Sequence, residues 1–123
     1  MVKIPKADRR PKKLGAAFYQ TASGSEPVRE WLLQLRDEDR KILGEDIATL
    51  EFGWPIGMPV CRALGRRLYE VRTDLKDRIA RVMFLIDGGE MVLLHGFIKK
   101  SQATAKSDLE LARKRQRAWE KER

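Results

Sequence analysis

The sequence has one cysteine, one histidine and no long apolar run. A lone Cys61 cannot form an internal disulfide and is typical of a small buried residue. A zinc site would need unusual carboxylate ligands, so we expect neither a metal nor another cofactor. Residues 1–13 lack the apolar core of a signal peptide, and no segment is long enough to span a membrane. These absences favour a cytoplasmic protein.

Positive charge is abundant but unevenly distributed. The formal net charge is +8, and residues 1–13 contain six Lys or Arg against one acid. Residues 62–81 and 99–123 are also basic, whereas residues 22–51 are acidic. This asymmetry favours a nucleic acid or an acidic protein as partner, and the alternative is a solvated basic surface with no partner.

The length of 123 residues fits one domain. We place that domain at residues 14–123, after a flexible basic arm at residues 1–13 that contains two prolines. Loose alternation of apolar side chains predicts a first strand over residues 14–20, and a turn follows it.

Two helices are predicted after that turn. Ser25 is a candidate N-cap, and Pro27 suits a first helical turn because its missing N–H has no partner there. Apolar residues recur at helical spacing up to Leu35. A second apolar stripe, capped at Asp37, runs to Leu50, so this segment is either a helical hairpin or one helix with a break near Asp37. Glycine and proline then predict a loop over residues 52–59.

The C-terminal half predicts three strands and a helix. The strands cover residues 68–73, 78–86 and 91–98, with turns at Lys76-Asp77 and Asp87-Gly88-Gly89. Short turns between sequential strands favour an antiparallel meander. A capping box at Ser107 starts a helix that runs to about residue 120. The predicted fold class is α+β, with a small antiparallel sheet packed against an N-terminal helical hairpin and a C-terminal helix.

The strands carry fixed cations and the one imidazole. No glycine-rich phosphate loop, CxxC, HExxH or Ser-His-Asp pattern accompanies them. A site built from Arg, Lys and His suits a polyanion, and RNA is a polyanion that such groups can cleave. His95 is either a hydrogen-bonded core residue or a general acid or base. Alternation along a strand predicts that Leu94 and Gly96 face away from it.

Arg81 lies in an otherwise apolar strand and is the least ordinary of the cations. A guanidinium binds phosphate through two parallel hydrogen bonds, which suits the stabilisation of a pentacoordinate phosphorane. Arg72 either shares that site or occupies a solvent face. Lys99 and Lys100 end the last strand and face opposite ways, so only one of them easily reaches a shared site.

Other basic residues suit binding rather than chemistry. Tyr69 either stacks on a base or packs in the core. The tract at residues 113–117 forms a solvated helix face or contacts nucleic acid. The residues predicted to bind the RNA backbone are Arg66, Arg67, Lys76 and Arg78.

Four segments in order carry a resemblance to a known family. They are Pro27–Leu32, Leu68–Arg72, Arg81–Phe84 and His95–Gln102. Over residues 14–120 the chain resembles the RelE/ParE toxin superfamily and, within it, the HigB-like, phage-derived branch. Ala105 stands where this branch commonly has a proline.

The resemblance implies a fold, an activity and partners. It implies a RelE-like fold and the toxin of a type II toxin–antitoxin system, a ribosome-dependent mRNA endonuclease (an mRNA interferase). In that reaction the ribose 2′-OH attacks the adjacent phosphate without a metal. The implied partners are the ribosome, mRNA and a helix-turn-helix antitoxin.

The resemblance also implies residue roles. Arg81 stabilises the phosphorane, Arg72 positions the phosphate, and Lys99 or Lys100 acts as base or electrostatic support. His95 is an auxiliary acid or a structural residue. The final helix has no tyrosine, which leaves the general acid unassigned.

Two other functions are compatible with the sequence. One is a ParE-like toxin that binds DNA gyrase without cutting RNA, since a fold does not fix a function. The other is a basic RNA-binding domain without activity. Cations that converge from three strands favour the nuclease.

Overall fold

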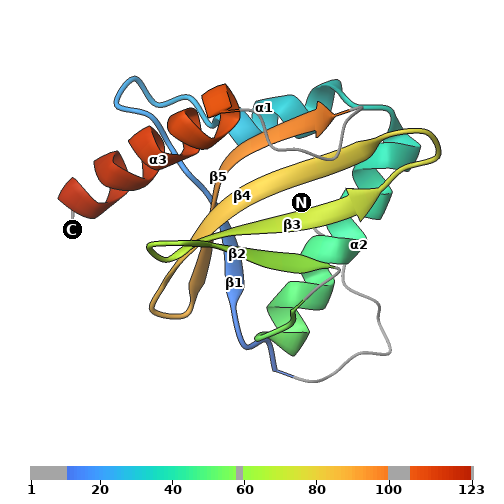
Figure 1. The fold of residues 1–123 in the computed structure, drawn as a ribbon, viewed down its shortest axis with the longest axis horizontal. Coiled ribbons are helices and arrows are strands. Elements are labelled where there is room, and N and C mark those ends of the chain that lie inside the picture. Colours follow the sequence, from blue (N-terminus) through green and yellow to red (C-terminus); the bar gives the residue numbers. More distant parts are fainter. Residues whose placement is uncertain (1–10, 58–59, 100–105, 123) are drawn as a thin grey trace.

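The computed structural model describes residues 11–57, 60–99 and 106–122 (Figure 1). They form a five-stranded mixed sheet and three helices, which confirms the predicted α+β class. Along the chain the elements are β1 (Gly15–Phe18), α1 (Pro27–Gln34), α2 (Asp37–Gly53), β2 (Cys61–Gly65), β3 (Leu68–Asp74), β4 (Ile79–Asp87), β5 (Glu90–Lys99) and α3 (Lys106–Lys121).

The sheet has the strand order β1-β5-β4-β3-β2. Strands β2 to β5 form an antiparallel meander, as predicted for its last three members. β1 pairs in parallel with β5, with Gly15 opposite Glu90 and Phe18 opposite Leu93. The predicted antiparallel sheet thus includes one parallel pair that the sequence did not indicate. β1 reaches β5 through a long connection that includes the helical hairpin, which is the kind of connection that parallel pairing requires.

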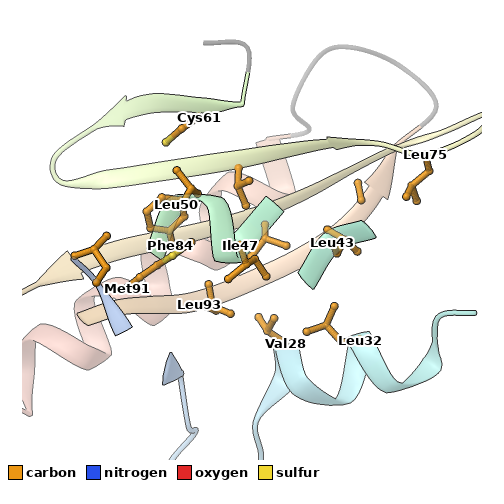
Figure 2. Close-up of a cluster of buried hydrophobic side chains, with 14 residues drawn as sticks. Val28, Leu32, Leu43, Ile47, Leu50, Cys61, Leu75, Phe84, Met91 and Leu93 are labelled. Atoms are coloured by element: carbon orange, nitrogen blue, oxygen red, sulfur yellow. The ribbon is translucent and has the colours of Figure 1, made fainter. Parts of the chain in front are cut away.

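The helices cover the two faces of the sheet. α1 and α2 pack on one face, and α3 crosses the other (Figure 1). Leu43, Ile47 and Leu50 of α2 are fully buried in one cluster with side chains of the strands and of α1 (Figure 2). Burial of each such side chain contributes about 1.5–3 kcal/mol. The predicted apolar faces of α1 and α2 therefore hold the larger core.

The helix starts differ slightly from those expected. Pro27 lies in the first turn of α1 as predicted, but the N-cap is Glu26 rather than Ser25. The Ser25 hydroxyl instead hydrogen-bonds to the Thr21 hydroxyl at 2.8 Å. Asp37 is the first residue of α2 and follows its N-cap. Within the described ranges, no helix is long and apolar enough to cross a bilayer.

β2 is a strand that the sequence did not predict. It pairs with β3, and the connecting turn has three successive residues with positive φ, of 87°, 51° and 65° at Gly65, Arg66 and Arg67. α3 holds this turn, because the Arg113 guanidinium donates to the carbonyl of Gly65 at 2.9 Å. The Gln116 amide donates to the carbonyl of Arg66 at 2.7 Å.

Candidate functional site

A β-bulge in β5 sets the direction of the imidazole. In the register between β4 and β5, Met83 lies opposite His95 and Phe84 opposite Leu93, so Leu94 is an extra residue. Leu94 packs in the cluster beneath α3, and His95 hydrogen-bonds to a residue of α3. Both side chains therefore share the α3 face, and the prediction that Leu94 faces away from His95 is wrong. An extra residue in one strand breaks the alternation and re-aims the next side chain.

Asp108 joins two of the predicted site residues. His95 Nε2 lies 2.8 Å from Asp108 Oδ1, and Lys99 Nζ lies 3.6 Å from Asp108 Oδ2. The side chains of His95, Lys99 and Asp108 are only 14%, 19% and 20% exposed, so solvent screens their interactions incompletely. Asp108 lies in the first turn of α3, where the helix N-terminus stabilises a carboxylate.

Phe97 supports the same two residues from the strand. The His95 ring stacks on the Phe97 ring, with centroids 5.2 Å apart and an interplanar angle of 23°. Lys99 Nζ lies 5.8 Å from the centroid of the same ring, within the range of a cation–π interaction. Phe97 is itself almost fully buried. The imidazole and the ammonium thus rest on a fixed apolar surface.

Two arginines extend this face across the sheet. Arg72 lies opposite Arg81, which lies opposite Phe97, so the three side chains share a face. Arg72 is 28% exposed, and its Nε is 3.9 Å from Asp74 Oδ1. Arg81 is 2% exposed, and its Nη1 donates to Glu70 Oε1 at 2.7 Å. Arg72 is accessible to a ligand, whereas the charge of Arg81 is buried and compensated by Glu70.

The residues predicted to bind RNA fall in three places. The turn that holds Arg66 and Arg67 lies at the end of β3 remote from Lys99. Lys76 is exposed in the β3–β4 turn, near the Lys99 end of β5. Arg78, in the same turn, donates to Asp39 of α2 at 2.6 Å, and this bond raises the pKa of Arg78 above its ordinary value.

The predicted aromatic residue lies on the opposite face. Tyr69 stacks with Phe84 at a centroid distance of 5.6 Å and meets Trp54 edge-on at 5.1 Å. This face is covered by α1 and α2, so Tyr69 does not join the His95 cluster. Lys100, Gln102, Thr104 and Ala105 lie outside the described residues, as do residues 1–10 of the predicted arm.

The basic tract of α3 is partly structural. Arg115 donates to the carbonyl of Leu94 at 2.8 Å and so ties α3 to the bulge. Burial lowers the pKa values of Arg113 and Arg115, and for Arg113 the charges of Arg66 and Arg117 lower it further. Lys114 and Arg117 are exposed. The tract therefore anchors the helix with some arginines and presents the others to solvent.

This geometry joins an imidazole, a carboxylate and an ammonium, and it places the guanidinium of Arg72 on the same face of the sheet. Such groups can exchange a proton and bind an anion. In the part of the chain that the structure describes, no three His, Cys, Asp or Glu side chains gather as metal ligands.

Comparison with known protein families gives a match over most of the chain. The family described as "Phage derived protein Gp49-like (DUF891)" has a model that matches residues 30–117. The matched segment includes His95, Lys99 and Asp108. A search of curated proteins found no match.

Proposed function

The chain belongs to the Gp49-like family of phage-derived, toxin-like proteins, and from that premise we propose that it is an endoribonuclease of RelE type. In this proposal it is the HigB-like toxin of a type II toxin–antitoxin pair and cuts mRNA on the ribosome. The observation that carries the proposal is that His95 and Lys99 meet at Asp108, on the face of the sheet that also holds Arg72.

The chemistry uses the RNA itself as nucleophile. The ribose 2′ oxygen attacks the adjacent phosphorus, the bond from phosphorus to the 5′ oxygen breaks, and a 2′,3′-cyclic phosphate and a 5′-hydroxyl result. His95 accepts the proton of the 2′-hydroxyl, and solvent protonates the leaving 5′ oxygen. Lys99 and Arg72 stabilise the negative charge of the phosphorane. One such donor is worth roughly 10²–10³ in rate.

Arg81 takes a different part in this proposal from the one that the resemblance implies. Its burial against Glu70 disfavours direct contact with a phosphate. We assign Arg81 a structural role in the sheet. It lies opposite Arg72 of β3 and Phe97 of β5 and so holds these two site residues in place. Lys100, outside the described residues, remains a second candidate lysine.

The proposed partners follow from charge and from the resemblance. A net charge of +8 and the exposed basic residues of α3 suit ribosomal RNA and mRNA. A helix-turn-helix antitoxin is the proposed neutralising partner. Purified ribosomes added to a cleavage assay test the ribosome dependence directly.

Primer extension on a reporter mRNA after brief induction in bacteria tests the nuclease. Wild type is compared with Lys99→Ala and Arg72→Ala, and with the control Lys41→Ala, an exposed basic residue of α2. We expect cuts within translated codons that weaken at least about tenfold in the two site variants and persist in the control.

Three outcomes would overturn this proposal. Intact mRNA with arrested growth and altered DNA supercoiling would indicate a gyrase-binding toxin. Intact mRNA with normal growth would indicate a binding domain without activity. Cuts of equal strength in all variants would show that the protein is a nuclease but that Lys99 and Arg72 do not form its site.

A further inference from the structure

The one histidine of the chain has a carboxylate on one ring nitrogen. An ionised carboxylate only accepts hydrogen bonds, so Nε2 of His95 must be the donor. We infer that Asp108 is a positioning residue that fixes neutral His95 as its Nε2–H tautomer and leaves Nδ1 as the proton acceptor.

The surroundings of Asp108 are favourable for a carboxylate. It lies in the first turn of α3, where the partial positive charge of the helix favours an anion. The ammonium of Lys99, 3.6 Å from Oδ2, adds a second favourable charge. Because Asp108 and His95 are both mostly buried, their hydrogen bond is stronger than it would be in water.

Three contacts keep the ring facing Asp108. The Phe97 ring stacks against one side of the imidazole. Arg115 binds the carbonyl of Leu94, so α3 is attached to the residue that precedes His95. The bulge at Leu94 directs His95 to the α3 face. Together these contacts hold the ring where Nε2 meets Asp108. Because Asp108 and His95 lie on different elements, the tautomer depends on the tertiary structure.

Other charged groups lie on the same face of the sheet as His95 or on α3. Arg81 and Glu70, on β4 and β3, neutralise each other in an ion pair, and Lys99 shares Asp108 with the ring. Arg115 directs its guanidinium to a backbone carbonyl. Among the described residues, the hydrogen-bond partner of the imidazole is therefore Asp108.

The consequence for catalysis rests on the proposed function. Nδ1 accepts the proton of the 2′-hydroxyl while Nε2–H stays bonded to Asp108. The resulting imidazolium then forms an ion pair with that carboxylate. Asp108 does not touch the RNA and acts through His95.

Nuclear magnetic resonance reads the tautomer directly. A two-bond ¹H–¹⁵N correlation spectrum of the ¹⁵N-labelled full chain contains one histidine side chain, so no assignment is needed. The spectrum is recorded in alkaline buffer, where an imidazole is neutral. We expect the proton on Nε2, with an Nε2–H resonance protected from exchange. A proton on Nδ1 in the wild-type chain would overturn the inference, whatever the variants do.

Variants test the role of Asp108. Asp108→Ala and the size-conserving Asp108→Asn are compared with Glu110→Gln, which removes an exposed acid of the same helix that lies 3.9 Å from Lys106. We expect loss of the protected Nε2–H resonance in Asp108→Ala and its retention in the control. Cleavage should fall by about 10²-fold in Asp108→Asn, since general acid–base catalysis contributes about 10²–10⁴.

The readouts separate the two proposals. A fixed Nε2–H tautomer in a chain that cuts no RNA would overturn the proposed function and keep the positioning by Asp108. Cleavage that is unchanged in both Asp108 variants would overturn the catalytic role of the carboxylate and keep the nuclease.

Discussion

A Cβ atom on Gly96 would lie 2.4 Å from Cε3 of the Trp31 indole, so the backbone of β5 is in direct contact with this ring of α1. This distance is far below an ordinary van der Waals contact. Trp31 and Gly96 belong to two of the segments that carry the family resemblance. Their contact docks α1 on the strand next to His95.

Gly96→Ala should therefore destabilise the fold. The added methyl must displace the indole, and such overpacking costs about 1–3 kcal/mol in the free energy of unfolding. Urea denaturation measures it. Gly44→Ala in α2 is the control, because a Cβ there meets nothing within 4 Å. That control should gain about 0.5–1 kcal/mol, and equal stability of the two variants would contradict the prediction.

Removal of one partner of the buried Arg81–Glu70 ion pair should destabilise the protein strongly. Arg81→Met leaves Glu70, which is 1% exposed, without its arginine. We expect a loss of about 3–5 kcal/mol in the free energy of unfolding. The double variant Glu70→Leu, Arg81→Met should recover much of that loss. Additive effects in the cycle of single and double variants would show that the two side chains are not coupled.

Arg66→Gly should stabilise the protein. Arg66 has a φ of 51°, a conformation that costs a residue with a side chain roughly 1–2 kcal/mol and glycine little. Part of this benefit is offset because glycine loses more backbone entropy on folding. We therefore expect the free energy of unfolding, measured by heat or urea, to rise by about 0.5–1 kcal/mol. Arg62→Gly, in the strand β2, should lose a similar amount. A loss in both variants would refute the argument from backbone conformation.

Cys61 should be inert in the folded chain. Burial, and secondly the charge of Glu70, raises the pKa of this thiol from 9.0 to about 11. We expect slow alkylation by iodoacetamide at about pH 8 in buffer and rapid alkylation in denaturant, because the thiolate is the reactive form. Rapid alkylation of the native protein would contradict this burial.

The same shift has a consequence for stability. Between pH 9.0 and about 11 the unfolded thiol has lost its proton and the folded thiol has kept it. The unfolded state then binds fewer protons, so stability falls as pH rises through this window, by up to about 3 kcal/mol. Cys61→Ala should lack this component when the two pH profiles are compared.

The local patterns in the sequence were sufficient for most elements. Helical spacing predicted α1 and α2, and the turn at Gly88 predicted the β4–β5 hairpin, because these signals depend on near neighbours. β2 was missed, since Cys61–Gly65 contains no β-branched residue and owes its conformation to pairing with β3.

The site was less accessible to sequence reasoning. One extra residue at Leu94 reverses the direction of His95, and no residue type marks that bulge. Asp108 was seen only as part of a capping box, because its contact with His95 depends on how α3 crosses the sheet. Similarly, the burial of Arg81 follows from its pairing with Glu70 across two strands, which requires the register.

Because β1 pairs with β5, it cannot join the sheet when it is synthesised. Residues 15–18 leave the ribosome early, but the strand that they pair with is complete only after residues 90–93 have been made. β2 to β5 need no such wait, because each pairs with its neighbour in sequence across a short turn. The first strand to be synthesised therefore waits longest for the strand that it pairs with.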